Sequence, residues 1–146
     1  MTQISLLIRI KASPEEVYEK ISTSEGIAKW FTDASFSKDE DTGELNLQLW
    51  GKTDFKVTER SPPSRVVWHC TSEDNPWFGT DIVFDLKTES DRTIVIFDHA
   101  GWSETSDLYR DCAMSWAYFL ESLRLLIEEG VGTPEGVAPK CEASAT

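Results

Sequence analysis

The segment from about residue 104 to residue 129 carries apolar residues at helical spacing, which predicts one long helix with a single apolar face. At about 100° per residue, these positions fall within an arc of roughly 120°, the width expected for a helix that lies on a sheet. The helix would be roughly 39 Å long at about 1.5 Å per residue, enough to cross a small sheet. The apolar positions are Leu108, Cys112, Trp116, Phe119, Leu120, Leu123, Leu126 and Ile127.

Most of the chain before this helix alternates apolar and polar residues at period two, which indicates β-strands. The alternating segments are residues 4–11, 43–50, 53–60, 65–70, 80–87 and 91–102. Residues 13–31 differ, because Ser13, Pro14 and Glu16 form a capping box that starts a short helix. Ser24 opens a second short helix, "SEGIAKWF".

This order of elements predicts an α+β fold. An antiparallel sheet with one apolar face has to be covered, and only the C-terminal helix is long enough to cover it. We expect a curved sheet of six or seven strands wrapped around that helix, in a single domain over residues 1–130. Gly130 is a natural C-cap, and the Pro/Gly-rich residues 131–146 are expected to form a flexible tail.

Charge and composition exclude several classes of function. The chain has 14 basic and 26 acidic residues, a net charge of -12, which repels nucleic acid and anionic membranes. It shows neither a signal peptide nor an apolar run of roughly 20 residues, so we expect a cytoplasmic protein. Two histidines and three distant cysteines give no CxxC pair and no metal-ligand spacing. We therefore expect no metal and no cofactor.

Four segments resemble the SRPBCC superfamily, whose members share the helix-grip fold with START lipid-transfer domains. They are "IKASPEEVYEKISTSEGIAKWFT", "SPPSRVVW", "RTIVIFDHAGW" and "WAYFLESLRLLIEEGVGTP". The likeness is closest to homologues of the activator of heat-shock protein 90 ATPase, a group that includes polyketide-cyclase-like members. The resemblance implies a cavity between sheet and helix that takes hydrophobic or aromatic molecules. It implies no universal catalytic residue.

His99 is the main polar candidate for this cavity, because it lies in phase with Val95 and Phe97 on a predicted strand. Its imidazole is suited to hold a polar group of a ligand or to act as a general base. The structural alternative is a histidine satisfied by the adjacent loop. Asp98 cannot form a dyad with it, because neighbouring strand residues point to opposite faces. The same alternation places His69 on the solvent face.

The aromatic residues are the second signal, since six tryptophans are many for 146 residues. Those on inner faces are either packing or cavity wall, and those at element ends lie where an entrance is expected. Trp77 belongs to the latter group. The predicted ligand-binding set is Trp30, Phe31, Trp68, Phe84, Phe97, His99, Trp102, Cys112, Trp116 and Phe119.

Three functions remain open from the sequence. The leading hypothesis is binding of a small hydrophobic or aromatic ligand without catalysis, because no nucleophile, base and orienting group can be assembled. A cyclase or dehydratase that uses the same cavity is the second. The third is protein interaction, as a homodimer or with a chaperone, through an apolar patch of Met114, Tyr118 and Leu125 on the helix.

Overall fold

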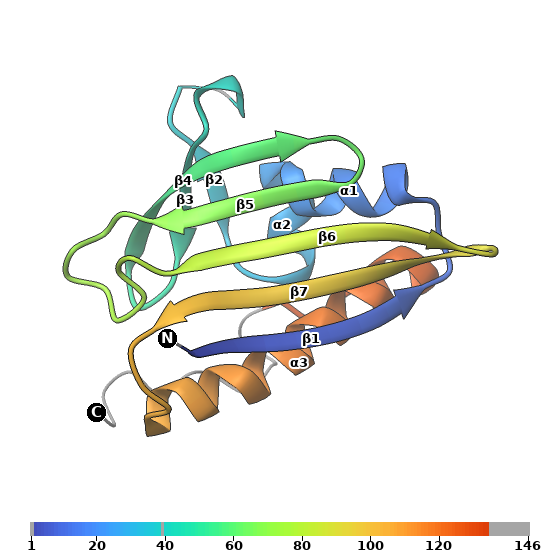
Figure 1. The fold of residues 1–146 in the computed structure, drawn as a ribbon. Helices are drawn as coiled ribbons and strands as arrows, with labels where there is room; N and C mark the ends of the chain where they lie inside the picture. The colour runs from blue at the N-terminus through green and yellow to red at the C-terminus, as the bar shows by residue number, and fades with distance from the viewer. Residues whose placement is uncertain (1, 39, 135–146) are drawn as a thin grey trace.

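The computed structural model describes residues 2–38 and 40–134 as one curved antiparallel sheet with three helices (Figure 1). Seven strands pair in the order β1-β7-β6-β5-β4-β3-β2. This is the predicted α+β helix-grip arrangement. The elements are β1 (Thr2–Ile10), α1 (Pro14–Ser22), α2 (Ser24–Trp30), β2 (Ala34–Phe36), a 3-10 turn (Glu40–Thr42), β3 (Glu44–Gln48), β4 (Lys52–Ser61), β5 (Arg65–Cys70), β6 (Asp81–Glu89), β7 (Arg92–Trp102) and α3 (Asp107–Glu129).

The C-terminal helix α3 lies along the sheet, as its apolar stripe predicted. It packs on β1 and on α2, while α1 packs on β5, β6 and β7 and also contacts α3 (Figure 1). Seven of the eight predicted stripe residues are buried, and Ile127 is half-buried. Ser115 and Ser122 are buried beside them.

The sheet supplies the other half of the core through its alternating strands. On β7, Thr93, Val95, Phe97 and His99 are all buried, and the residues between them are half-buried. Cross-strand pairing aligns the same face of β6, because Phe84 pairs with Phe97. The predicted inward direction of His99 is therefore confirmed.

Helix boundaries follow the capping residues. Ser13 accepts a hydrogen bond from the Glu16 backbone N–H, which confirms the capping box of α1. The N-cap of α2 is Thr23, one residue before the predicted start at Ser24. Ser106 caps α3, so the helix begins at Asp107 rather than near residue 104, because β7 continues to Trp102. Gly130 ends α3 with φ 90°, the left-handed conformation that favours glycine.

The structure differs from the sequence-based expectations at the edge strand β2 and directly after α3. The edge strand β2 was not predicted, because three residues are too short to show an alternating pattern. After α3, the Thr133 backbone N–H donates to Ser122 Oγ at 2.6 Å, and a Cβ added to Gly132 would lie 2.6 Å from the Lys29 carbonyl oxygen. Gly132 and Thr133 thus pack against the end of α2 and against α3, and residues 135–146 of the predicted tail lie outside the described residues.

None of the helices in the described part of the chain combines the length and the apolar character needed to cross a bilayer.

Replacing a core residue of α3 tests the packing of this helix on the sheet. Leu123 is fully buried, so Leu123→Ala should lower the free energy of unfolding by about 2–5 kcal/mol, measured by urea denaturation. Met114 lies on the same helix with 72% of its surface exposed, so Met114→Ala should change the free energy of unfolding by less than about 0.5 kcal/mol. Equal effects of the two substitutions would show that α3 does not pack on the sheet through the face that contains Leu123.

Candidate functional site

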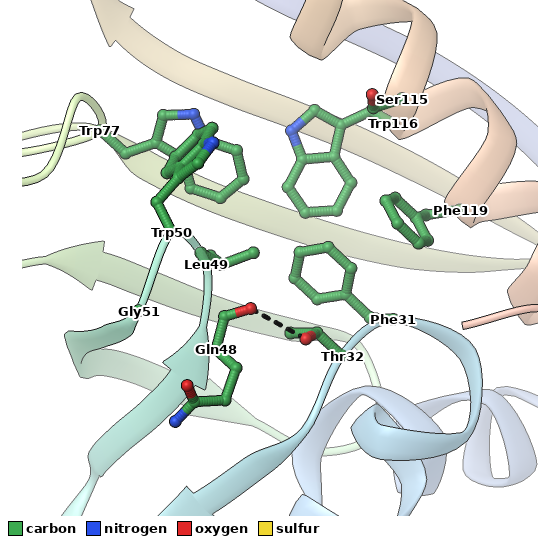
Figure 2. Close-up of a pocket in the computed structure, with 10 residues that line it drawn as sticks. All are labelled: Phe31, Thr32, Gln48, Leu49, Trp50, Gly51, Trp77, Ser115, Trp116 and Phe119. Carbon is green, nitrogen blue, oxygen red and sulfur yellow. Dashed lines mark hydrogen bonds between the residues drawn. The ribbon is translucent and has the colours of Figure 1, made fainter. Parts of the chain in front are cut away.

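A cavity of about 370 Å³ opens between the N-terminal half of α3, the end of α2 and the turn between β3 and β4. Five of its ten described lining residues are aromatic, and Figure 2 shows them on two sides of the space. Trp50 and Trp77 lie on one side, opposite Trp116, Phe31 and Phe119. The other lining residues are Thr32, Gln48, Leu49, Gly51 and Ser115.

The β3–β4 turn (residues 49–51) places Trp50 at the cavity mouth. Trp50 and Gly51 adopt φ values of 56° and 101°, so the chain reverses sharply between the two strands. The Leu49 backbone N–H donates to the Gly51 carbonyl at 2.8 Å, and Thr53 Oγ1 donates to the Leu49 carbonyl at 2.7 Å. These bonds hold the turn so that the Trp50 side chain, 42% exposed, stands at the rim.

The β5–β6 loop (residues 71–80) contributes Trp77 and is tied to that turn. Asn75 Nδ2 donates to Thr53 Oγ1 at 2.9 Å and to the Leu49 carbonyl at 3.3 Å. The Trp77 indole N–H donates to Cys112 Sγ of α3 at 3.4 Å. Trp77 is therefore fixed from two directions and is only 2% exposed.

Helix α3 forms the opposite wall with Trp116 and Phe119. The ring centroids of Phe31 and Trp116 are 4.9 Å apart, as are those of Phe31 and Phe119. Trp116 also stacks on Trp77 at 5.7 Å with an interplanar angle of 23°. The walls of the cavity are thus one continuous set of ring contacts, and such pairs add about 0.5–1.5 kcal/mol each beyond their area burial.

A buried chain of hydrogen bonds fixes the two central tryptophans. The Trp116 indole N–H donates to His99 Nδ1 at 3.0 Å. An indole can only donate, so Nδ1 carries no proton and the His99 proton is on Nε2. This Nε2–H donates to Thr80 Oγ1 at 2.8 Å, and the Thr80 hydroxyl donates to the Trp77 carbonyl at 2.6 Å. We call these three bonds the His99 chain.

His99 is neutral within this chain. Its side chain is fully buried, and desolvation lowers its pKa from 6.5 to about 3. Both ring nitrogens are occupied by protein partners, and His99 is not among the described residues that line the cavity. The imidazole therefore positions Trp116 and the β5–β6 loop from behind the wall.

The structure brings only part of the predicted site together around the cavity. Phe31, Trp116 and Phe119 line it. The other seven residues of the predicted set do not appear among its described lining residues, and all are buried: Trp30, Trp68, Phe84, Phe97, His99, Trp102 and Cys112.

Several of these buried residues pack within the core that supports the walls. The Trp30 indole N–H donates to the Lys20 carbonyl at 2.8 Å. The ring centroids of Phe97 and Trp116 are 4.4 Å apart, so Phe97 packs against the Trp116 ring. Trp102 packs against His99 at 5.0 Å, and its indole N–H is buried with no partner in the described part of the chain.

Sequence reasoning missed the lining residues of the β3–β4 turn, together with Thr32, Gln48 and Ser115. It expected Trp77 near an entrance but left it out of the ligand-binding set, and Trp77 does line the cavity. Alternation suggested that Trp50 ends a strand on the face opposite Leu49, but β3 stops at Gln48. The combination of a large aromatic residue with glycine in "LWG" was the available signal for an exposed aromatic turn. Ser115 gave a weaker signal, as a small polar residue beside Trp116 near the apolar arc.

The other candidate groups lie away from the cavity. His69 pairs with Asp81 through Nδ1 and Oδ1 at 2.7 Å, with 38% of its side chain exposed, as its strand phase predicted. Asp98 lies on the face of β7 opposite His99, so no dyad forms. Among the described residues, no group of three or more potential metal ligands occurs, and no lining residue is an acid, a cysteine or a histidine.

The predicted apolar patch on α3 is smaller than its three residues suggested. Met114 is exposed, but Tyr118 and Leu125 are half-buried, and the Tyr118 ring packs against Phe119 at 6.4 Å. The patch therefore consists mainly of Met114 in the described structure.

Comparison with known proteins gives a family and several similar structures. The family described as "Activator of Hsp90 ATPase homolog 1-like protein" matches residues 11–128. The chain is similar to the Aha1 dimer of Colwellia psychrerythraea, with 36% identity, a TM-score of 0.79, and coverage of 90% of this chain and 100% of that one. No curated protein is similar enough to this chain to count as a match.

Two further solved structures share the fold. BH1534 of Bacillus halodurans is 26% identical, with a TM-score of 0.74 and coverage of 88% of this chain and 98% of that one. CalU16 of Micromonospora echinospora is 25% identical, with a TM-score of 0.70 and coverage of 91% and 78% respectively.

The buried neutral state of His99 predicts a loss of stability in acid. Below pH 6.5 the unfolded chain binds a proton at His99 that the folded protein does not bind until about pH 3. The His99 contribution to the free energy of unfolding is therefore complete above pH 6.5. It falls by on the order of 4 kcal/mol as the pH drops from 6.5 to 3.

The matched variant is His99→Gln, because a glutamine can accept from Trp116 and donate to Thr80 without titrating. In urea unfolding from pH 7 to pH 4, the wild type should lose more stability than this variant. An identical pH slope for the two proteins would contradict the burial and neutrality of His99.

Proposed function

Because the chain belongs to the Activator of Hsp90 ATPase homolog 1-like family, as its sequence motifs predicted, we propose that it binds a small hydrophobic molecule in the cavity between α3 and the β3–β4 turn. The observation that carries this proposal is the aromatic lining of an open space of about 370 Å³. Ligand sites are typically concave and apolar, with a few polar groups that orient the ligand.

The polar groups of the cavity support orientation of a ligand rather than its conversion. Thr32, Gln48 and Ser115 supply two hydroxyls and an amide among the described lining residues. Nucleophilic catalysis needs a base that touches the nucleophile, and none of these lining residues is such a base. His99 would have been the candidate, but both of its nitrogens are held within the His99 chain. We therefore favour binding over the cyclase or dehydratase alternative.

Fixed walls favour affinity for a rigid, flat ligand. A protein whose binding site is already ordered pays less entropy on binding than one that must order its side chains. The indole groups of Trp77 and Trp116 are each held by a hydrogen bond, so their orientation does not depend on a ligand. The His99 chain thus orders the walls of the proposed site before a ligand binds.

A second candidate function is contact with a chaperone or with another copy of the chain. The family description names an activator of the Hsp90 ATPase, and the similar Colwellia protein was solved as a dimer. Met114, with 72% of its surface exposed on α3, is the residue of this chain that we assign to such a contact. Its substitution by glutamate should weaken the contact and leave ligand binding unchanged.

A cavity-filling substitution tests the proposed ligand site. Ser115 lines the cavity and is 5% exposed, so the larger side chain of Ser115→Phe should occupy the space. Binding of the neutral fluorescent probe N-phenyl-1-naphthylamine should weaken at least about tenfold, as followed by probe fluorescence.

Ala117→Phe is the matched control, because Ala117 is exposed on the same helix two residues away. It should leave probe affinity unchanged, and circular dichroism should show both variants folded. Probe binding that survives in a folded Ser115→Phe variant would place the binding site elsewhere and contradict the proposal.

A further inference from the structure

We propose that this cavity selects hydrophobic cations, such as an ammonium group attached to a flat aromatic ring system, over neutral and anionic molecules of the same shape. This inference rests on the proposed function and adds the charge of the ligand to it.

The described lining of the cavity offers no positive group to receive an anion. None of the described residues that line the cavity is charged. Lys52 follows the β3–β4 turn directly, but its side chain borders a different surface pocket, together with Glu44, Asp54 and Lys56. The whole chain carries a net charge of -12, so its long-range field attracts cations and repels anions.

The two central indoles direct their N–H groups into the protein. The positive edge of an indole is its N–H, and the negative potential lies on the ring faces. The N–H of Trp116 points to His99 and that of Trp77 points to Cys112, so both are directed into the protein. Neither indole therefore presents its N–H donor to the cavity, where a donor would favour an anionic ligand.

Aromatic rings from several elements surround the space. Trp50 meets Trp77 edge to face at 5.4 Å on one side, and Phe31 meets Phe119 at 4.9 Å on the other (Figure 2). A cation placed between them contacts more than one ring, and each favourable cation–π contact contributes measurably when the site is desolvated. Such aromatic enclosures are the common solution for binding quaternary ammonium groups.

The polar lining does not offset this preference. The Thr32 hydroxyl donates its proton to the Gln48 carbonyl at 2.9 Å, so this proton is committed within the protein. The Leu49 carbonyl at the mouth adds a negative dipole, although Thr53 and Asn75 already donate to it. Neither of these two groups offers a donor to an anionic ligand, and Figure 2 shows the Gln48 side-chain amide directed away from the aromatic rings.

Three naphthalene probes of matched shape test the inference: (2-naphthyl)trimethylammonium, 2-tert-butylnaphthalene and naphthalene-2-sulfonate. Each is titrated against the protein carrying N-phenyl-1-naphthylamine, and displacement is followed by fluorescence. The cation should bind at least about fivefold more tightly than the neutral probe, and the sulfonate should bind most weakly. The neutral probe is the more hydrophobic of the first two, so burial alone predicts the reverse order.

The outcomes separate the two proposals. If the neutral probe binds as tightly as the cation or more tightly, the charge selectivity is wrong and the proposed hydrophobic site stands. If N-phenyl-1-naphthylamine and all three naphthalenes fail to bind, both proposals are wrong.

A variant at the rim assigns the selectivity to the rings. Trp50→Leu keeps an apolar side chain but removes a π face, so it should reduce the ratio of cation to neutral affinity by about threefold. Phe119→Leu should act in the same direction and covers the case in which Trp50→Leu disturbs the turn. Phe78→Leu is the control, since Phe78 is 52% exposed and is not among the described lining residues. An unchanged ratio in both lining variants would contradict a role of the rings in charge selection.

Discussion

The hydrogen bond from the Trp116 indole to His99 is the interaction on which the rest of the site depends. It joins α3 to β7, and the remainder of the His99 chain joins β7 to the β5–β6 loop through Thr80 and the Trp77 carbonyl. An unpaired buried imidazole or indole N–H costs about 1–3 kcal/mol, so each partner in this chain constrains the others. Desolvation keeps His99 neutral, and only the neutral imidazole can accept from Trp116 while donating to Thr80. His99 thus supports the walls of the cavity without being one of its described lining residues.

This constraint explains why one end of the space between sheet and helix is filled and the other is open. Leu120, Leu123 and Leu126 of the C-terminal half of α3 are buried against the core. At the N-terminal half of α3, Trp116 is held toward His99, and Trp77 of the β5–β6 loop is held toward Cys112 and against Trp50 of the β3–β4 turn. Apart from Leu49, the non-aromatic lining residues are small or polar. The cavity is therefore a consequence of where the hydrogen bonds direct the large rings.

The fold was predictable from the sequence because its signals are local. The capping box at Ser13 and Glu16, the glycine at 130 and the apolar arc of α3 each act through neighbours within one or two helical turns. The phase of β7 likewise gave the inward direction of His99. The site was only partly predictable, because the partners of His99 come from distant segments and depend on register. Trp50 was assigned by alternation to a strand that ends two residues earlier, since a turn with positive φ breaks the period. Core residues and cavity-wall residues share one apolar face in the sequence pattern. The predicted set therefore included the lining residues Phe31, Trp116 and Phe119. It also included the core residues Trp68, Phe84 and Phe97, because the pattern does not distinguish the two kinds.

The most direct test of this account is a pair of crystal structures, of the protein alone and with N-phenyl-1-naphthylamine. We expect the same open cavity in both, with the Trp116 indole N–H within hydrogen-bonding distance of His99 Nδ1 and the probe lying between Trp50 and Phe119. A cavity closed by its own aromatic side chains in the unliganded crystal, or a probe bound at another surface, would contradict a preformed site held open by the His99 chain.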